Sequence, residues 1–90
     1  MDDYQSPADW DEVKHGLAAR LREVRMELYG EHGGPMLAEE LKIPHRAWVR
    51  YENGASMPAQ VMLRFLERTG ANPHWLLTGA GSRFATRREG

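Results

Sequence analysis

The stretch that decides the fold lies at residues 36–54 and reads MLAEELKIPHRAWVRYENG. Its apolar residues recur at helical spacing on both sides of a break at Lys42-Ile43-Pro44. Ile43 precedes a proline, which pushes its backbone toward an extended conformation and ends the first helix. The second helix is expected from about His45 to Asn53, and Gly54 is placed to take the left-handed conformation that closes it. The stretch therefore predicts two short helices joined by a tight turn.

A longer helix is expected before this stretch, from the start signal Ser6-Pro7 to about Tyr29. Gly16 lies inside it and marks either a bend or a break between a short leader helix and a main one. Apolar residues recur along this helix in steps of three and four, which predicts a core face and leaves a partner-binding face as the alternative. These residues are Trp10, Val13, Leu17, Leu21, Val24 and Leu28.

Two further helices are expected after residue 54. Pro58 starts the first and Gly70 closes it, and Asn72-Pro73 starts a short second one. No segment alternates apolar and polar residues with the period of a strand. The sequence therefore predicts an all-α fold, a compact domain of four to five helices. The expected inward stripe of the longer of these two helices is Met62, Phe65, Leu66 and Thr69.

The composition fits one small domain of 90 residues. There is no cysteine, which excludes disulfides and zinc–cysteine sites. The longest apolar runs are a few residues, so we expect no membrane span. The acidic N-terminus is unlike a targeting signal, so we expect a cytoplasmic protein. Three parts are expected: an acidic leader over 1–15 that can extend the first helix, a helix-turn-helix domain over 16–79, and a flexible Arg-containing tail over 80–90.

Charge is unevenly distributed along the chain. The formal net charge is −1, but five of the 13 acidic residues precede the first basic residue, Lys14. The remainder carries 12 Lys or Arg against eight Asp or Glu. This asymmetry is compatible with a basic face beside an acidic leader. Alternatively, the acidic residues only favour the first turn of the opening helix.

Metal chemistry and catalysis are not expected. The four histidines show no spacing typical of a metal site, and no cysteine supports them. Ser6, Ser56 and Ser82 fall at caps, loops or the tail, without a nucleophile elbow or a cofactor-binding glycine signature. We therefore expect a non-enzyme that binds no metal and no cofactor.

The helix over 45–53 carries a basic face. Trp48 and Tyr51 are spaced three apart on the side that packs against the neighbouring helices. Two short helices joined by a tight turn are an arrangement that places the second helix in the major groove of DNA. Arginine can bond both acceptors on the major-groove edge of guanine, and valine can contact a thymine methyl group. The candidate base-reading residues are His45, Arg46, Val49 and Arg50.

Phosphate contacts are needed to fix the register of such a helix on DNA. Gly33 and Gly34 lie just before a helix and are expected to leave backbone N–H groups at its positive end, where a phosphate can bind. Alternatively, the two glycines only allow a sharp chain reversal. Asn53 lies on the exposed face and is a third candidate phosphate contact. Further candidates are Arg20, Arg22, and the tail residues Arg83, Arg87 and Arg88.

Several separated motifs keep one order and spacing: Leu37-Ala38, then WVRYENG at 48–54, then Pro58, then WLLTG at 75–79. Together they resemble the Xre/Cro/C1-type helix-turn-helix family of phage repressors, over roughly residues 17–79. The resemblance implies a structural ion pair between Arg25 and the glutamate of the E-N-G motif, Glu52. The chain departs from the family pattern in the turn, where Lys42 replaces a glycine and Pro44 replaces a capping serine or threonine. A non-glycine residue with positive φ is strained by ~1 kcal/mol.

We therefore expect sequence-specific binding of double-stranded DNA by a repressor-like transcriptional regulator. A homodimer on a two-fold site is expected, because one reading helix covers only a few base pairs. Its contact would involve either Leu76, Leu77 and Phe84 or the leader around Tyr4 and Trp10. The alternative is a protein-interaction module, or an antitoxin-like partner, that keeps the fold with weak or no DNA binding. An exposed apolar patch would favour this alternative.

Overall fold

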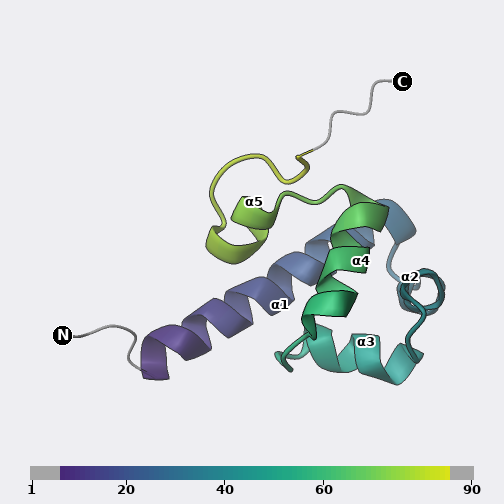
Figure 1. The fold of residues 1–90 in the computed structure, drawn as a ribbon, viewed down its shortest axis with the longest axis horizontal. Helices are drawn as coiled ribbons and strands as arrows, with labels where there is room; N and C mark the ends of the chain where they lie inside the picture. The colour runs from purple at the N-terminus through teal and green to yellow at the C-terminus, as the bar shows by residue number, and fades with distance from the viewer. Residues whose placement is uncertain (1–6, 86–90) are drawn as a thin grey trace.

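The computed structural model describes residues 7–85, with side chains described from Trp10 onward. This part of the chain contains five helices. They are α1 (Pro7–Tyr29), α2 (Gly34–Leu41), α3 (His45–Glu52), α4 (Ala59–Thr69) and α5 (Pro73–Thr78) (Figure 1). Within 7–85 there is no strand, only an isolated antiparallel bridge between Ala71 and Phe84. The predicted all-α class is confirmed. None of these helices is both long and apolar enough to cross a membrane.

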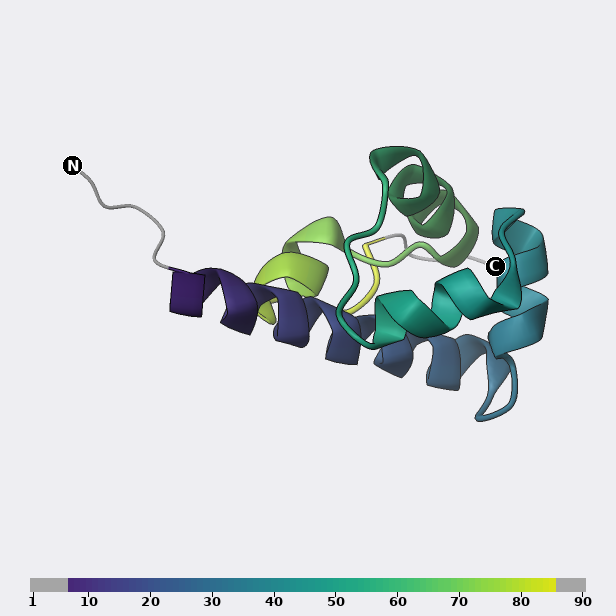
Figure 2. The ribbon, with the colours of Figure 1, turned by 90° about the horizontal axis from the view of Figure 1, so that it is seen from below.

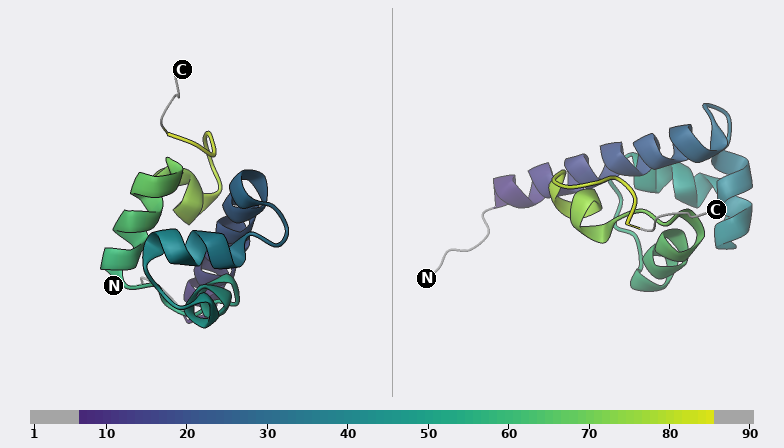
Figure 3. Two further views of the ribbon diagram at one scale, coloured as in Figure 1. Left: turned by 90° about the vertical axis from the view of Figure 1, so that its right-hand side faces the viewer. Right: turned by 90° about the horizontal axis from the view of Figure 1, so that it is seen from above.

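The long helix α1 is the support on which the others pack. It contacts α2, α3 and α5, and α2 contacts α3 and α4 (Figure 2). The helices α2, α3 and α4 gather around the C-terminal half of α1, and α5 lies along its middle (Figures 1 and 3). The first turns of α1 extend past all the other helices (Figures 1 and 2, and Figure 3, right). One end of this helix therefore projects from the body of the protein.

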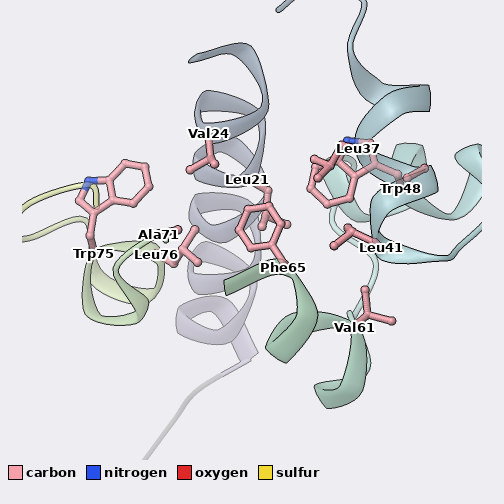
Figure 4. Close-up of a cluster of buried hydrophobic side chains, with 11 residues drawn as sticks. Leu21, Val24, Leu37, Leu41, Trp48, Val61, Phe65, Ala71, Trp75 and Leu76 are labelled. Atoms are coloured by element: carbon pink, nitrogen blue, oxygen red, sulfur yellow. The ribbon is translucent and has the colours of Figure 1, made fainter. Parts of the chain in front are cut away.

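A single apolar core joins the helices (Figure 4). Trp48 of α3 stacks on Phe65 of α4 with ring centroids 5.6 Å apart and an interplanar angle of 22°. Offset stacking of this kind adds to the free energy gained from burial alone. The largest fully buried side chains are Trp48, Phe65, Leu21, Leu37, Leu41, Leu76 and Val24.

Local chemistry sets the helix ends much as the sequence predicts. Lys42 ends α2 in the left-handed conformation, with φ 60° and ψ 44°. Pro44 precedes α3 without a side-chain cap, whereas Asn72 caps α5 by accepting a hydrogen bond from the His74 N–H at 3.1 Å. Gly54 has φ 102° just after α3, where a side chain would be strained.

The apolar stripe of α1 is only partly a core face. Leu21 and Val24 are fully buried and Leu17 is half-buried, as expected. Trp10, Val13 and Leu28 are instead 53%, 38% and 45% exposed. The prediction is wrong at both ends of the stripe: Trp10 and Val13 lie on the projecting end of α1, and Leu28 lies on a side of its last turns that the other helices leave open. Gly16 makes no break, since α1 runs without interruption from Pro7 to Tyr29.

The expected flexible tail over 80–90 also needs correction, because residues 80–85 fold back onto the body of the protein. Asn72 N–H donates to the Arg83 carbonyl at 2.8 Å, and Ala85 N–H donates to the Gly70 carbonyl at 2.9 Å. The Phe84 side chain packs against the core. We call residues 80–85 the strap. The rest of the predicted tail, 86–90, lies outside the described residues.

Candidate nucleic-acid interface

The helix α3 has two chemically different sides. Its inner side carries Trp48, which is 1% exposed. Its outer side is exposed and carries every residue predicted to read bases: His45, Arg46, Val49 and Arg50. Asn53, just past the end of the helix, is exposed as well, and its Nδ2 donates to the Val49 carbonyl at 2.8 Å. We call these five residues the α3 face.

The two arginines of this face are available for a partner. Neither Arg46 nor Arg50 makes a salt bridge or a side-chain hydrogen bond with any residue in the described range 7–85. Because they are four residues apart on a helix, both guanidinium groups lie on the same side. An exposed helix with two uncompensated guanidinium groups attracts an anionic surface.

An ion-pair network fixes α3 on α1. The Arg25 guanidinium grips Glu52 through two bonds, Nε to Oε2 and Nη2 to Oε1, both 2.9 Å. This is the ion pair that the family resemblance implies. Trp48 Nε1 donates to Glu52 Oε2 at 2.6 Å, so the same carboxylate also holds the buried side of α3. The pair is nearly closed to solvent, with side chains 12% and 10% exposed for Arg25 and Glu52.

The titration of Glu52 reflects this network. Burial raises the pKa of Glu52, but hydrogen bonds from Arg25 and Trp48 and the charges of Arg25 and Arg22 outweigh burial and leave the pKa below its ordinary value. The hydrogen bond to Glu52 in turn raises the pKa of Arg25. Both groups are therefore charged at neutral pH, and the network is a permanent link between α1 and α3.

The prediction that Gly33 offers a bare N–H to a phosphate is wrong. Its N–H donates to the Gly30 carbonyl at 3.1 Å, and the residue is buried. A Cβ at Gly33 would lie 2.2 Å from the Tyr29 carbonyl oxygen, and one at Gly34 would lie 2.9 Å from His45 Nε2. The glycines therefore allow close packing of the chain against α1 and α3, which agrees with the alternative that they serve the chain reversal.

A hollow of about 310 Å³ nevertheless joins the start of α2 to the α3 face. His32 and Gly34 line it from one side, and His45 and Val49 line it from the other. Two carboxylates also border it: that of Glu52, which is paired, and that of Glu31, which is exposed. The structure thus brings Gly34, part of the predicted phosphate site, beside the candidate base-reading residues. The charges around this hollow are of both signs rather than purely positive.

Two of the other basic candidates are committed to internal contacts. Arg20 Nε donates to the Leu76 carbonyl at 2.6 Å, and Arg83 pairs with Glu23 and Glu27 on α1. Arg22 is exposed, and its Nε lies 3.6 Å from Glu52 Oε1. The remaining candidates, Arg87 and Arg88, lie outside the described residues.

A second hollow, of about 170 Å³, borders the α3 face and was not expected from the sequence. Arg50 lines it together with Ser56 and Pro58, at the start of α4. Pro58 supplies no side-chain cap to α4, which leaves the first N–H groups of that helix without a capping partner. The sequence feature that could have indicated this hollow is the lack of a capping side chain before α4.

No group of three or more His, Asp or Glu side chains within the described range could hold a metal ion. Comparisons with protein-family models, curated proteins and solved structures found no match to this chain. The interpretation of the site therefore depends on its own residues and their geometry.

Proposed function

We propose that this protein binds double-stranded DNA with sequence preference and acts as a repressor-like transcriptional regulator. The observation that carries the proposal is the α3 face: an exposed row of His45, Arg46, Val49 and Arg50 on a helix whose other side is locked by Trp48 and Glu52. A reading helix needs exposed hydrogen-bond donors on a rigid support, because misplaced donors lose discrimination between bases.

The local architecture supports the same proposal. Two eight-residue helices, α2 and α3, pack against each other across the turn at residues 42–44. We interpret this pair as a helix-turn-helix, an arrangement whose second helix enters the major groove. The Arg25–Glu52 pair is the one that the resemblance to the phage-repressor family implies. Base contacts by Arg46 and Arg50 would discriminate by roughly 1–3 kcal/mol each.

Selection of bound sequences from a random duplex pool tests this proposal. We expect enrichment of a short motif, and we expect Arg46→Ala and Arg50→Ala each to cost roughly 1–3 kcal/mol of binding free energy on that motif. Arg68→Ala is the matched control, because Arg68 is an exposed arginine on α4 that lines neither of the two hollows beside the α3 face. An unenriched pool, together with no duplex binding even at low salt, would refute the proposal.

One observation favours a second candidate function, that of a protein-interaction module. Trp10 and Leu77 are 53% and 52% exposed, and both line an apolar groove. An exposed apolar patch of this kind marks a contact with another protein. The two candidates use different surfaces, so a loss of DNA binding in the Arg46 and Arg50 variants, whose apolar groove is unchanged, would favour DNA reading over this alternative.

A further inference from the structure

An apolar groove of about 460 Å³ runs beside the projecting end of α1. Its floor is the N-terminal half of α1, and its rims are the end of α5 and the loop after α3. The sequence pattern placed Trp10 and Leu77 in two alternative dimer contacts, but the structure brings both to this one groove. The large apolar residues that line it include Trp10, Val13, Leu17, Tyr51, Met57 and Leu77, and the buried Leu21 lies at its inner end.

The projecting end of α1 is expected to need a partner. Trp10 and Val13 are 53% and 38% exposed there, whereas Leu21, farther along the same stripe, is 1% exposed. Short helices are marginal in water unless an apolar face is packed against something. Covering Trp10 and Val13 would both bury apolar surface and hold the first turns of α1 in helical form.

The charges beside the groove are of both signs, so two copies of this part of the protein can complement each other. Among the side chains described, from Trp10 onward, Lys14 is the only charged one that lines the groove. Asp11 and Glu12 are exposed on the same projecting turns, next to Trp10. A segment that fits the groove should therefore present a large apolar side chain with a carboxylate beside it, and the start of α1 itself has both.

We propose that the groove is filled by the start of α1 from a second copy of this chain, related by a two-fold axis. The two helix ends run antiparallel, so that Trp10 of each copy enters the groove of the other. With the axis crossing α1 between Glu12 and Val13, Asp11 of one copy lies opposite Lys14 of the other, and the pair occurs twice. A two-fold interface uses the same patch on both copies, which this arrangement satisfies.

The position of the groove links the dimer to DNA. Tyr51 and Gly54, at the end of α3, border the groove. A second copy docked there contributes its own α3, related to the first by the two-fold axis. Two reading helices then address two half-sites, a consequence that rests on the proposed function. The dimer itself does not depend on DNA.

Sedimentation of the full chain over a range of concentrations, without DNA, tests the pairing. We expect the wild type to reach twice the 10.3 kDa mass of one chain. Trp10→Glu and Val13→Glu should each raise the dimer dissociation constant at least about tenfold, because each places a charge in an apolar contact. Leu63→Glu on α4 is the matched control: Leu63 is 58% exposed and does not line the groove. Circular dichroism checks that each variant stays helical.

A charge swap gives a second test that does not depend on the apolar residues. Asp11→Lys and Lys14→Asp should each weaken the dimer, because each places like charges opposite one another. The double variant should restore dimerisation, since the pair is reversed in both copies. Restoration supports the antiparallel register, and failure of the double variant to recover overturns it.

The remaining outcomes overturn the proposal. A wild type that stays monomeric at every concentration overturns the pairing. A dimer that survives Trp10→Glu but is lost in Leu63→Glu uses another face. Neither outcome decides whether α3 reads DNA, because Arg46 and Arg50 are unchanged in these variants. Conversely, a dimer sensitive to Trp10→Glu stands even if no DNA is bound.

Discussion

At the scale of single residues, Glu52 joins α1 to the buried side of α3, because it accepts hydrogen bonds from Arg25 of α1 and from Trp48 of α3. We expect Glu52→Gln to lower the free energy of unfolding at pH 7 by about 1.5–3 kcal/mol, the usual contribution of a hydrogen bond to a charged group. Urea unfolding monitored by circular dichroism measures this change. Glu67→Gln, an exposed glutamate on α4, is the control and should have little effect.

The stabilising effect of Glu52 should also depend on pH. Burial raises the pKa of Glu52, but hydrogen bonds from Arg25 and Trp48 and the charges of Arg25 and Arg22 outweigh burial and hold the pKa below its ordinary value of 4.5. Its stabilising effect is therefore complete above about pH 4.5 and is lost as the pH falls through the lower, folded-state pKa. The stability difference between wild type and Glu52→Gln should shrink in acid. A difference that stays constant with pH would contradict this account.

Lys42 is the one non-glycine residue with positive φ in the described range 7–85. Lys42→Gly should raise the free energy of unfolding by ~1 kcal/mol, because glycine has no Cβ to clash in the left-handed conformation. Lys42→Ala removes the same charge but keeps a Cβ, so it should give no such gain. Thermal unfolding of the three proteins separates strain from charge, and equal gains from both variants would assign the effect to charge.

At the scale of elements, the strap over residues 80–85 covers α5 and the segment before it. Arg83 lies over the Trp75 ring, 5.3 Å from its centroid, and bonds Glu23 on α1 at 3.1 Å. Because these charged groups are well exposed, such pairs contribute at most about 1 kcal/mol. The apolar contact of Phe84 with the core is therefore expected to hold the strap more than the ion pairs do.

Phe84→Ala tests this ranking. We expect faster hydrogen exchange at the Asn72 and Ala85 amides, whose N–H groups bond across the strap, with α1 to α4 little affected. Arg83→Gln should have a smaller effect on the same two amides. If Arg83→Gln accelerates their exchange more than Phe84→Ala does, the strap is held by charge instead.

At the scale of the whole molecule, features set by local sterics were predictable and features set by distant contacts were not. Ile43-Pro44 and Asn72-Pro73 act on neighbouring backbone, so the helix boundaries followed from the sequence. The periodicity of α1 identified its apolar side but not how far the other helices cover it, so the exposure of Trp10 was missed. Arg83 contacts two glutamates of α1 that lie 56 and 60 positions earlier in the chain, and no local sequence pattern predicts such contacts.

The candidate site also combines features that local sequence predicts with features that depend on distant contacts. The exposure of Arg46 and Arg50 followed from the helical spacing around Trp48. The pairing of Arg25 with Glu52 was implied only by the family resemblance, because the two residues are 27 positions apart. The burial of Gly33 against Tyr29 could not be inferred, since a glycine pair permits either an open helix end or a close chain reversal.

The most direct test of DNA reading by α3 is a map of backbone amide chemical shifts recorded while duplex DNA is added to the ¹⁵N-labelled protein. We predict the largest changes at His45–Arg50 and at the start of α2, with the effect weakening as salt is raised, since phosphate contacts release counterions. Changes centred on the apolar groove, or no change at low salt, would contradict the assignment of α3 as the reading helix.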